Sequence, residues 1–147
     1  MRFRRTAILL GAMSALVSTL LTPGAQASPP SASATYWQKC SPVNDEANRH
    51  MGTLCMDVKG AIGTQGVVGI GYWHANGVQK AVDLGITYVG NPNPPLVVYR
   101  GVVGAGGNTG THTRSSHIGS GCVAYPVMWF SSGSGMVRRT GSCVHVF

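Results

Sequence analysis

The sequence predicts an all-β fold, a small disulfide-stabilised β-sandwich of six to seven short antiparallel strands, with a small barrel as the alternative. Apolar and polar residues alternate in several segments, which is the pattern of half-buried strands. Glycine accounts for 21 of the 147 residues, about twice the usual ~7%, and it gathers in the turns between those segments. Charged residues make up only 10%, against roughly 25% in soluble domains. A nucleotide-binding α/β fold, with its long charged helices, is therefore not expected.

Residues 1–27 are predicted to be a signal peptide. Residues 1–5 are basic, residues 7–21 form an uncharged apolar run, and Ala25-Gln26-Ala27 fits the small-x-small rule for cleavage. The apolar run is shorter than the ~20 residues that a membrane-spanning helix prefers. We therefore expect a secreted, extracellular protein with no membrane attachment after cleavage. A second small-x-small site at residues 32–34 leaves the mature start open.

The net charge changes when this segment is set aside. The whole chain has eleven basic and four acidic residues, a net charge of +7, but three of the basic residues lie in residues 1–5. The remaining eight are spread along the chain, and only Arg138 and Arg139 are adjacent. A nucleic-acid binder needs roughly 6–10 phosphate contacts on one stripe. Nucleic acid is therefore not an expected partner.

After the leader we predict a flexible N-terminal tail over residues 28–38 and a single β domain over residues 39–147. The tail begins with small residues and proline, a composition typical of disorder. It ends with the aromatic pair Tyr36 and Trp37. An aromatic arm at this place would either dock on a partner or fold back over its own sheet.

The first strand is predicted over residues 53–59, where Leu54, Met56 and Val58 alternate with more polar positions. Residues 41–50, which precede it, are polar and are expected to form a short helix or a loop.

The next two strands, residues 67–75 and 78–89, are predicted to form a hairpin. Asn76 and Gly77 between them are the preferred residues of a two-residue type I′ turn, which needs positive φ at both positions. Pairing through that turn would place Trp73 opposite Lys80. One face of the second strand carries Val82, Leu84, Ile86 and Tyr88.

The remaining strands are separated by residues 91–95, 104–110 and 131–135, which are rich in proline, glycine and serine. Pro126 cannot donate a hydrogen bond, so its strand should lie at an edge or carry a bulge. The predicted strands are residues 96–103, a possible edge strand at 112–118, residues 122–130, and residues 136–147.

The four cysteines form an even set in a small exported chain, which predicts two disulfides. Three connectivities are possible, and sequence proximity favours Cys40–Cys55 with Cys122–Cys143. Each loop closure should stabilise the fold by roughly 3 kcal/mol. Zinc sites need pairs such as CxxC or HxxxH, and neither spacing occurs. We expect neither a metal nor a cofactor.

Catalytic motifs are weak throughout the chain. The four acidic residues leave little for a carboxylate pair, and there is no G-x-S-x-G nucleophile motif. The glycine-rich segment 104–110 lacks the Lys-Ser/Thr of a phosphate loop. The sequence therefore favours a non-enzymatic protein. A small secreted hydrolase such as a ribonuclease is the alternative, because histidine and arginine are both present.

Aromatic and arginine side chains remain as candidates for binding another secreted protein, since these types dominate interface energetics. Trp73 and Trp129 could instead belong to the core. The candidate partner-binding residues are Tyr36, Trp37, Trp73, Arg100, Arg138 and Arg139.

With its four cysteines and local disulfide pairs, the chain resembles the small four-cysteine β-proteins exported by high-GC Gram-positive bacteria. It is similar in architecture to amylase inhibitors of the tendamistat type, whose Trp-Arg-Tyr motif it lacks. Its segment 28–37 also resembles the extended N-terminal segment of the adaptor subunit of umbrella-type toxin particles. The first resemblance implies an inhibitor of an extracellular hydrolase. The second implies an adaptor in an extracellular, toxin-like complex, and we take this as the leading hypothesis.

Overall fold

The structure is a computed structural model that describes residues 35–75 and 77–147. The predicted signal peptide, residues 28–34 of the predicted tail, and Asn76 of the predicted turn lie outside the described residues.

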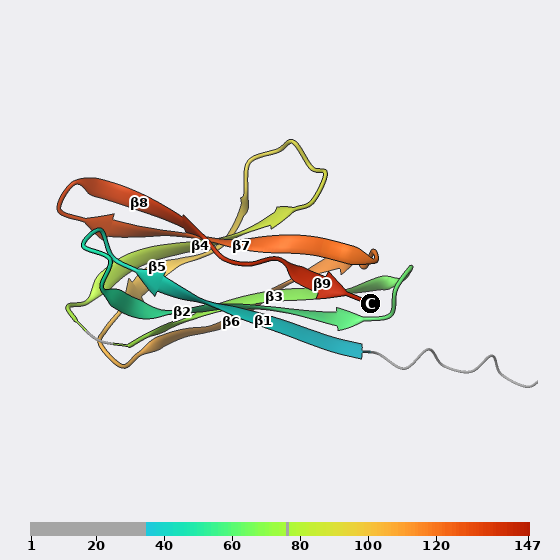
Figure 1. Cartoon of the computed structure of the whole chain (residues 1–147), viewed down its shortest axis with the longest axis horizontal. Coiled ribbons are helices and arrows are strands. Elements are labelled where there is room, and N and C mark those ends of the chain that lie inside the picture. The colour runs from blue at the N-terminus through green and yellow to red at the C-terminus, as the bar shows by residue number, and fades with distance from the viewer. Residues whose placement is uncertain (1–34, 76) are drawn as a thin grey trace, which may run out of the picture. The chain divides into compact units, whose positions relative to one another are not determined.

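The described residues form two antiparallel sheets that pack as two layers (Figure 1). The first sheet has the order β1-β2-β3-β6, and the second has the order β5-β4-β7-β8 with β9 also paired to β7. The all-β sandwich is confirmed, with nine described strands rather than six or seven, and the barrel alternative is wrong. The strands are β1 (Thr35–Asn44), β2 (His50–Gly60), β3 (Gln65–His74), β4 (Lys80–Tyr88), β5 (Leu96–Val103), β6 (Asn108–His117), β7 (Gly121–Ser132), β8 (Gly135–Thr140) and β9 (Val144–Val146).

The core lies between the two sheets and follows the period-two alternation of the sequence. On β2, Leu54, Met56 and Val58 are fully buried, as their alternation predicts. Of the predicted face of β4, three members are buried and Tyr88 packs against the core from its margin. The largest fully buried side chains are Tyr72, Phe130, Leu54, Met56, Ile70, Leu84, Ile86, Ile118 and Met128. Each contributes roughly 1.5–3 kcal/mol on burial.

The predicted hairpin between β3 and β4 is wrong. These strands belong to different sheets, and Trp73 lies opposite Thr53 of β2 rather than opposite Lys80. Both edges of β3 are occupied by β2 and β6, so no edge remains for β4. Gly77 has φ of +103°, a conformation that glycine adopts readily. In this fold Gly77 lies in the connection between the two sheets rather than in a hairpin turn.

The domain begins earlier than predicted. Strand β1 starts at Thr35, so residues 35–38, expected in the tail, pair with residues 57–60 of β2. Trp37 lies opposite the buried Val58 and packs against the core. The tryptophan therefore anchors the segment as an edge strand. The polar segment that follows forms the end of β1 and a turn, with no helix over residues 41–50.

Both predicted disulfides are present. Cys40 and Cys55 are direct cross-strand partners with Cα atoms 4.0 Å apart, so this bond joins β1 to β2. Cys122 and Cys143 join β7 to the segment before β9. The direct partner of Cys122 in the sheet is His145, because the predicted last strand is divided into β8 and β9.

Pro126 is not on an edge strand, since β7 pairs with β4 on one side and with β8 and β9 on the other. It lies at the break between those two partners, where Gly141 N–H donates to its carbonyl oxygen at 2.8 Å. In an antiparallel strand the N–H and C=O of one residue point to the same side. The missing donor of proline therefore faces the break in the ladder. The predicted edge strand at 112–118 is confirmed as β6, which begins at Asn108 within the predicted loop.

Candidate functional site

The six predicted partner-binding residues do not share one surface. Arg100 and Arg138 lie in one row on the outer face of the second sheet. Tyr36 and Trp73 lie on the outer face of the first sheet, opposite Lys59 and Thr53 of β2. These two β2 positions are six residues apart, which places the aromatics about 20 Å from each other. Trp37 and Arg139 face the interior side of their strands.

The row on the second sheet crosses all four of its main strands. By register, Arg100 of β5 lies opposite Asp83 of β4, which lies opposite Trp129 of β7, which lies opposite Arg138 of β8. Nε of Arg100 is 3.3 Å from Oδ2 of Asp83. The guanidinium carbon of Arg138 lies 5.8 Å from the centroid of the Trp129 ring, within the range of a cation–π interaction. We call these four residues the arginine–tryptophan row.

A glycine makes room for the indole of this row. A Cβ atom added to Gly85 would lie 2.9 Å from the Trp129 ring, closer than side-chain packing tolerates. The ring therefore lies over Gly85, half-buried, and points away from the core. The interpretation of Trp129 as a core residue is thus wrong, because its neighbours Met128 and Phe130 take the inner positions.

Exposed apolar side chains flank the row. Val102, Ala81, Ser131 and Met136 form the adjacent row by register, and Val102 and Met136 are 55% and 56% exposed. Apolar surface beside tryptophan and arginine is the composition of an interface centre. Sequence reasoning did not select Val102, Met136 or Trp129. The alternation within each strand places them on outer faces, but their proximity depends on strand order.

The remaining aromatic candidates lie elsewhere. Trp37 lines a groove of about 530 Å³ between β1 and the C-terminal segment, together with Tyr36, Val144 and Phe147. Figure 1 shows the end of β9 close to the start of β1. Trp73 on β3 is 42% exposed, so it is not a core residue.

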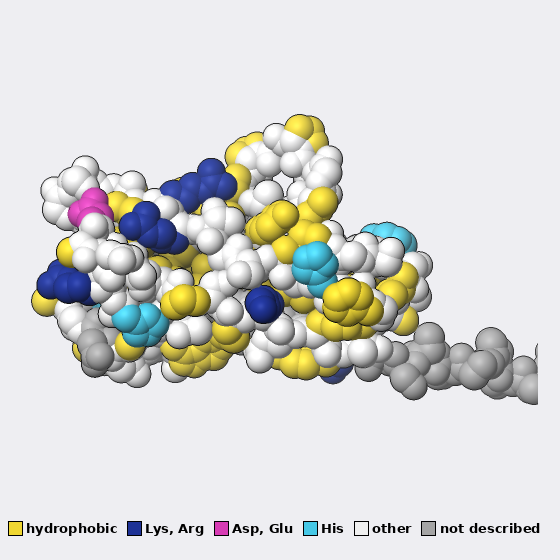
Figure 2. All heavy atoms as spheres, viewed as in Figure 1, with side chains coloured by type: hydrophobic (Ala, Val, Ile, Leu, Met, Phe, Trp, Pro, Cys, Tyr) yellow, Lys and Arg dark blue, Asp and Glu magenta, His cyan; other side chains and the backbone are white. Residues whose placement is uncertain are grey.

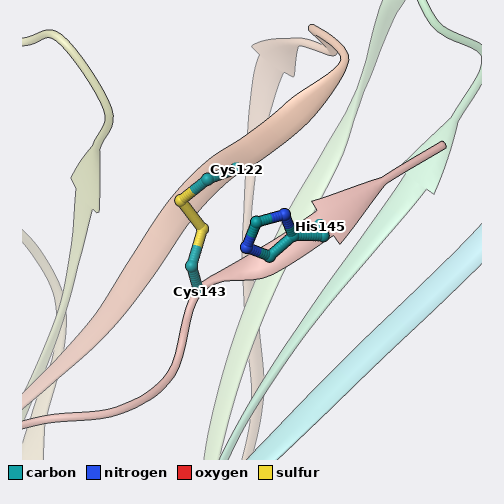
Figure 3. A group of neighbouring side chains, drawn as sticks. All are labelled: Cys122, Cys143 and His145. Carbon is teal, nitrogen blue, oxygen red and sulfur yellow. A yellow bond between two sulfur atoms is a disulfide. The ribbon is translucent and has the colours of Figure 1, made fainter.

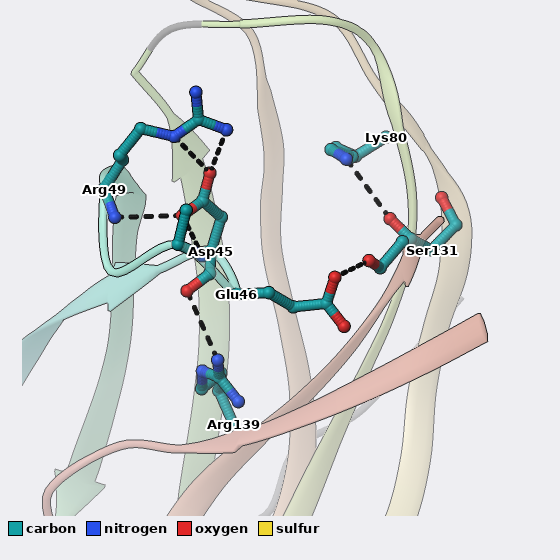
Figure 4. Close-up of polar contacts among 8 residues, drawn as sticks. Asp45, Glu46, Arg49, Lys80, Ser131 and Arg139 are labelled. Atoms are coloured by element: carbon teal, nitrogen blue, oxygen red, sulfur yellow. Dashed lines mark hydrogen bonds and ion pairs between the residues drawn. The ribbon is translucent and has the colours of Figure 1, made fainter. Parts of the chain in front are cut away.

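The turn between β1 and β2 forms a charged end of the sandwich (Figure 4). Asp45 binds Arg49 with an Oδ2-to-guanidinium distance of 2.7 Å and accepts hydrogen bonds from the backbone N–H groups of Ala47 and Arg49. The backbone N–H of Arg49, followed by its side chain, lowers the pKa of the Asp45 carboxyl. Arg139 donates to the backbone carbonyls of Asn44 and Asp45 and so ties the turn to β8.

Glu46 extends from the same turn to the β7–β8 hairpin. Its carboxylate accepts hydrogen bonds from the hydroxyls of Ser132 and Ser134, and these bonds lower the pKa of Glu46. A carboxylate with a lowered pKa is a weak base. Asp45 and Glu46 are thus arranged as structural acceptors. Basic side chains also gather at the end that carries β8 (Figure 2).

A cavity of about 390 Å³ adjoins this end and is lined by Asp45, Arg49, His50, His74 and Lys80, among others. His74 is buried, with Nδ1 3.0 Å from the Tyr72 hydroxyl and Nε2 3.1 Å from the carbonyl oxygen of Val78. Both ring nitrogens are therefore engaged within the fold. Burial raises the pKa of Tyr72 to about 12. The cavity thus places His50 beside Arg49 and Lys80. Its second histidine, His74, already uses both ring nitrogens for contacts within the fold.

One group of side chains has metal-ligand geometry in the part of the chain that the structure describes. Ligand atoms of Cys122, Cys143 and His145 lie within 4.8 Å of one another (Figure 3). The two sulfur atoms are bonded to each other, whereas metal binding by cysteine needs the thiolate. The oxidised pair therefore does not act as a metal ligand.

No protein-family model matches the chain, and neither the curated proteins nor the solved structures contain a match. The resemblance to exported inhibitors and toxin adaptors accordingly stays a prediction. Among the described residues, no helix has the length and apolar character needed to cross a membrane.

Proposed function

We propose that this chain is a secreted, non-enzymatic protein-binding module that serves as an adaptor in an extracellular complex. The single observation that carries the proposal is the arginine–tryptophan row, with exposed Val102 and Met136 beside it. The predicted signal peptide and the two disulfides support an extracellular location. The docking face is the outer face of the second sheet.

The charges of this face indicate the chemistry of the partner. The row holds two guanidinium groups and one carboxylate, and that carboxylate is already paired with Arg100. Arg138 contacts an indole face and, among the described residues, forms no ion pair. A partner surface with a carboxylate beside apolar side chains would complement Arg138, Val102 and Met136.

The state of the candidate catalytic groups supports a non-enzymatic role. Asp45 and Glu46 are held as low-pKa acceptors, His74 uses both ring nitrogens, and the cysteines are oxidised. The two carboxylates stabilise the β1–β2 turn and its contact with the β7–β8 hairpin, and the cysteines form disulfides. General acid–base chemistry instead needs a group with a pKa near the working pH.

The experiment is affinity capture from the culture supernatant of the organism that encodes the chain, with the secreted chain as bait. Arg138→Glu and Met136→Asp change the docking face, and Lys59→Glu makes the same charge reversal on the exposed outer face of the first sheet. We expect the first two variants to weaken binding of the captured partner at least about tenfold. Lys59→Glu should leave it unchanged. Equal capture by all three variants would contradict the proposed docking face.

The captured protein also decides between an adaptor and an inhibitor. An adaptor should join its partner to a further secreted component without changing an enzymatic activity. An inhibitor should capture a hydrolase and abolish its activity at one-to-one stoichiometry. Hydrolysis of RNA by the purified chain, lost in His50→Ala, would instead establish the hydrolase alternative.

A further inference from the structure

The pairing of β7 with β9 brings a histidine to the second disulfide. Cys122 and His145 are direct cross-strand partners, so their side chains lie on the same face of the sheet. The neighbours of His145, Val144 and Val146, are buried, which turns the imidazole outward. Figure 3 shows the ring beside the sulfur–sulfur bond, with one nitrogen turned toward it. Within residues 35–75 and 77–147 no other three side chains have metal-ligand geometry.

The distances among the three ligand atoms are close to those of a zinc site. The sulfur atoms of Cys122 and Cys143 and a nitrogen of His145 lie within 4.8 Å of one another. With Zn–S bonds of about 2.3 Å and Zn–N bonds of about 2.0 Å, tetrahedral ligands lie about 3.5–3.8 Å apart. The Cα atoms of the two cysteines are 5.8 Å apart, which leaves room for the sulfurs to separate to that spacing.

The backbone around these side chains is held by contacts other than the sulfur–sulfur bond. On one side of Cys143, the Gly141 N–H donates to the carbonyl oxygen of Pro126 at 2.8 Å, and the Ser142 N–H donates to Oγ of Ser41 at 2.7 Å. On the other side, β9 is paired with β7 and its two valines are buried. Opening the disulfide would therefore leave the three ligands near one another.

Solvent reaches this group, as both a reductant and an ion require. His145 is exposed and both cysteines are half-buried. The groove of about 530 Å³ beside β1 is lined by Cys143 and His145. Lys39 also lines this groove, but two thiolates cancel the charge of Zn²⁺, so the complex would place no net positive charge beside the lysine.

We propose that Cys122, Cys143 and His145 bind a zinc ion when their disulfide is reduced, with water as the fourth ligand. Two molecules of a low-molecular-weight thiol break the bond by exchange. They are oxidised to their own disulfide, and the chain gains two electrons and two protons as two thiols. Zn²⁺ then displaces both thiol protons and bonds to the two sulfurs and the imidazole. Reoxidation of the sulfurs releases the ion.

The ion would take over the structural role of the bond. Both join β7 to the segment before β9, so this clamp would persist in either redox state. Zinc suits the ligands better than other common ions do. Calcium takes six to eight oxygen ligands, and copper(I), which also prefers thiolates, passes in air to copper(II) and then oxidises them.

The test compares two double variants, each of which keeps one cysteine pair. Cys40→Ala/Cys55→Ala keeps the pair beside His145. Cys122→Ala/Cys143→Ala keeps a pair that has no histidine in ligand range among the described residues. Both are reduced with a phosphine under argon and titrated with Co²⁺, a coloured substitute for zinc. We expect the first variant to bind one ion per chain, displaced by Zn²⁺, and the second to bind at least about tenfold more weakly.

The histidine is tested within the first variant. His145→Ala should weaken binding at least about tenfold, because it removes one of three protein ligands. His50→Ala, at an exposed position of β2, should leave affinity unchanged. Zinc should raise the melting temperature of the reduced form by mass action and leave that of the oxidised form unchanged. If the reduced form unfolds without metal, zinc should restore its circular dichroism only when His145 is present.

Equal cobalt affinity of the two double variants, unchanged affinity in His145→Ala, or equal zinc binding by the oxidised chain would each overturn the proposal. A reduced chain that neither binds zinc while folded nor refolds with it would do the same. The measurement needs no partner protein, so its outcome is independent of the docking face on the second sheet.

Discussion

The outer face of the second sheet and the outer face of the first sheet each carry an aspartate, a tryptophan and a glycine beside its indole. On the second sheet, Trp129 lies over Gly85 and its row includes two arginines. On the first sheet, the Trp73 ring reaches Gly71, and Asp57 has no cation in ion-pair range among the described residues.

This difference shows that similar residues acquire different properties from their neighbouring strands. Strands β5 and β8 bring Arg100 and Arg138 to the outer face of the second sheet, whereas β1 and β6 bring Tyr36, Gln38, Thr111 and Thr113 to the outer face of the first. The second face is therefore internally paired and offers surplus positive charge. The first face offers an unpaired carboxylate.

The largest expected effect comes from the disulfides, which clamp one strand onto each sheet. Replacing both Cys40 and Cys55 with alanine should lower the free energy of unfolding by about 3 kcal/mol, because the unfolded chain regains the entropy of an open loop. The Cys122 and Cys143 double replacement should cost a similar amount. Urea denaturation measures both. A loss confined to one pair would show that the sheets depend unequally on their clamps.

Gly85→Val should have the next largest effect. The added side chain would occupy the place of the Trp129 ring, since even a Cβ atom would lie 2.9 Å from it. We expect a loss of about 1–3 kcal/mol and a changed tryptophan emission spectrum. Gly104→Ala is the control, because nothing lies within 4 Å of its added Cβ atom. A stable Gly85→Val variant with unchanged emission would mean that the ring does not need this glycine.

Arg138→Gln should cost about 0.5 kcal/mol by removing a cation–π interaction at an exposed site. The thermal denaturation midpoint should fall slightly. Arg114→Gln, at an exposed position of β6, should leave it unchanged. If both substitutions had the same effect, the loss would reflect net charge rather than stacking on Trp129.

The smallest expected effect is a difference between Asp57 and Asp45 in how each contribution to stability depends on pH. The pKa of Asp57 is raised, so the folded state binds its proton more tightly than the unfolded state, and its contribution to stability falls as pH rises through the folded pKa. Asp57→Asn should therefore be more stable than the original chain at neutral pH, by no more than about 0.5 kcal/mol. The difference should vanish in acid.

The contribution of Asp45 to stability changes with pH in the opposite direction. Its lowered pKa means that the carboxylate stabilises the fold above the unfolded pKa, and this contribution is lost as pH falls through the folded pKa. Asp45→Asn should be less stable than the original chain at neutral pH and equal to it in acid. Melting temperatures of both variants across the acidic range measure the two trends. Parallel trends would contradict the assignment of opposite pKa shifts.

The site could be predicted only in part. Arg100 and Arg138 were candidates because of residue type, and the structure places them in one row. Val102 and Met136 were not, because a single exposed apolar residue in a strand is ordinary. Arg139 was a candidate by type as well, but its guanidinium is used to bind the β1–β2 turn. Residue type indicates what a side chain is able to bind, whereas only its neighbours show whether it is already bound.

The alternation of apolar and polar residues was sufficient to predict the all-β class and the inner faces of β2 and β4, because alternation is a local property. Cysteine proximity favoured the two disulfide pairs that the structure contains. Three features depend on the assembly of distant strands. Strands β3 and β4 belong to different layers, and Pro126 of the central strand β7 lies opposite the break between β8 and β9. Arg100, Asp83, Trp129 and Arg138 form one row. The alternation of apolar and polar residues along a strand shows only which of its two faces is buried. Strand order depends on which distant strands bury those sides together, and a two-residue turn signal such as Asn76-Gly77 contributes too little free energy to override that choice.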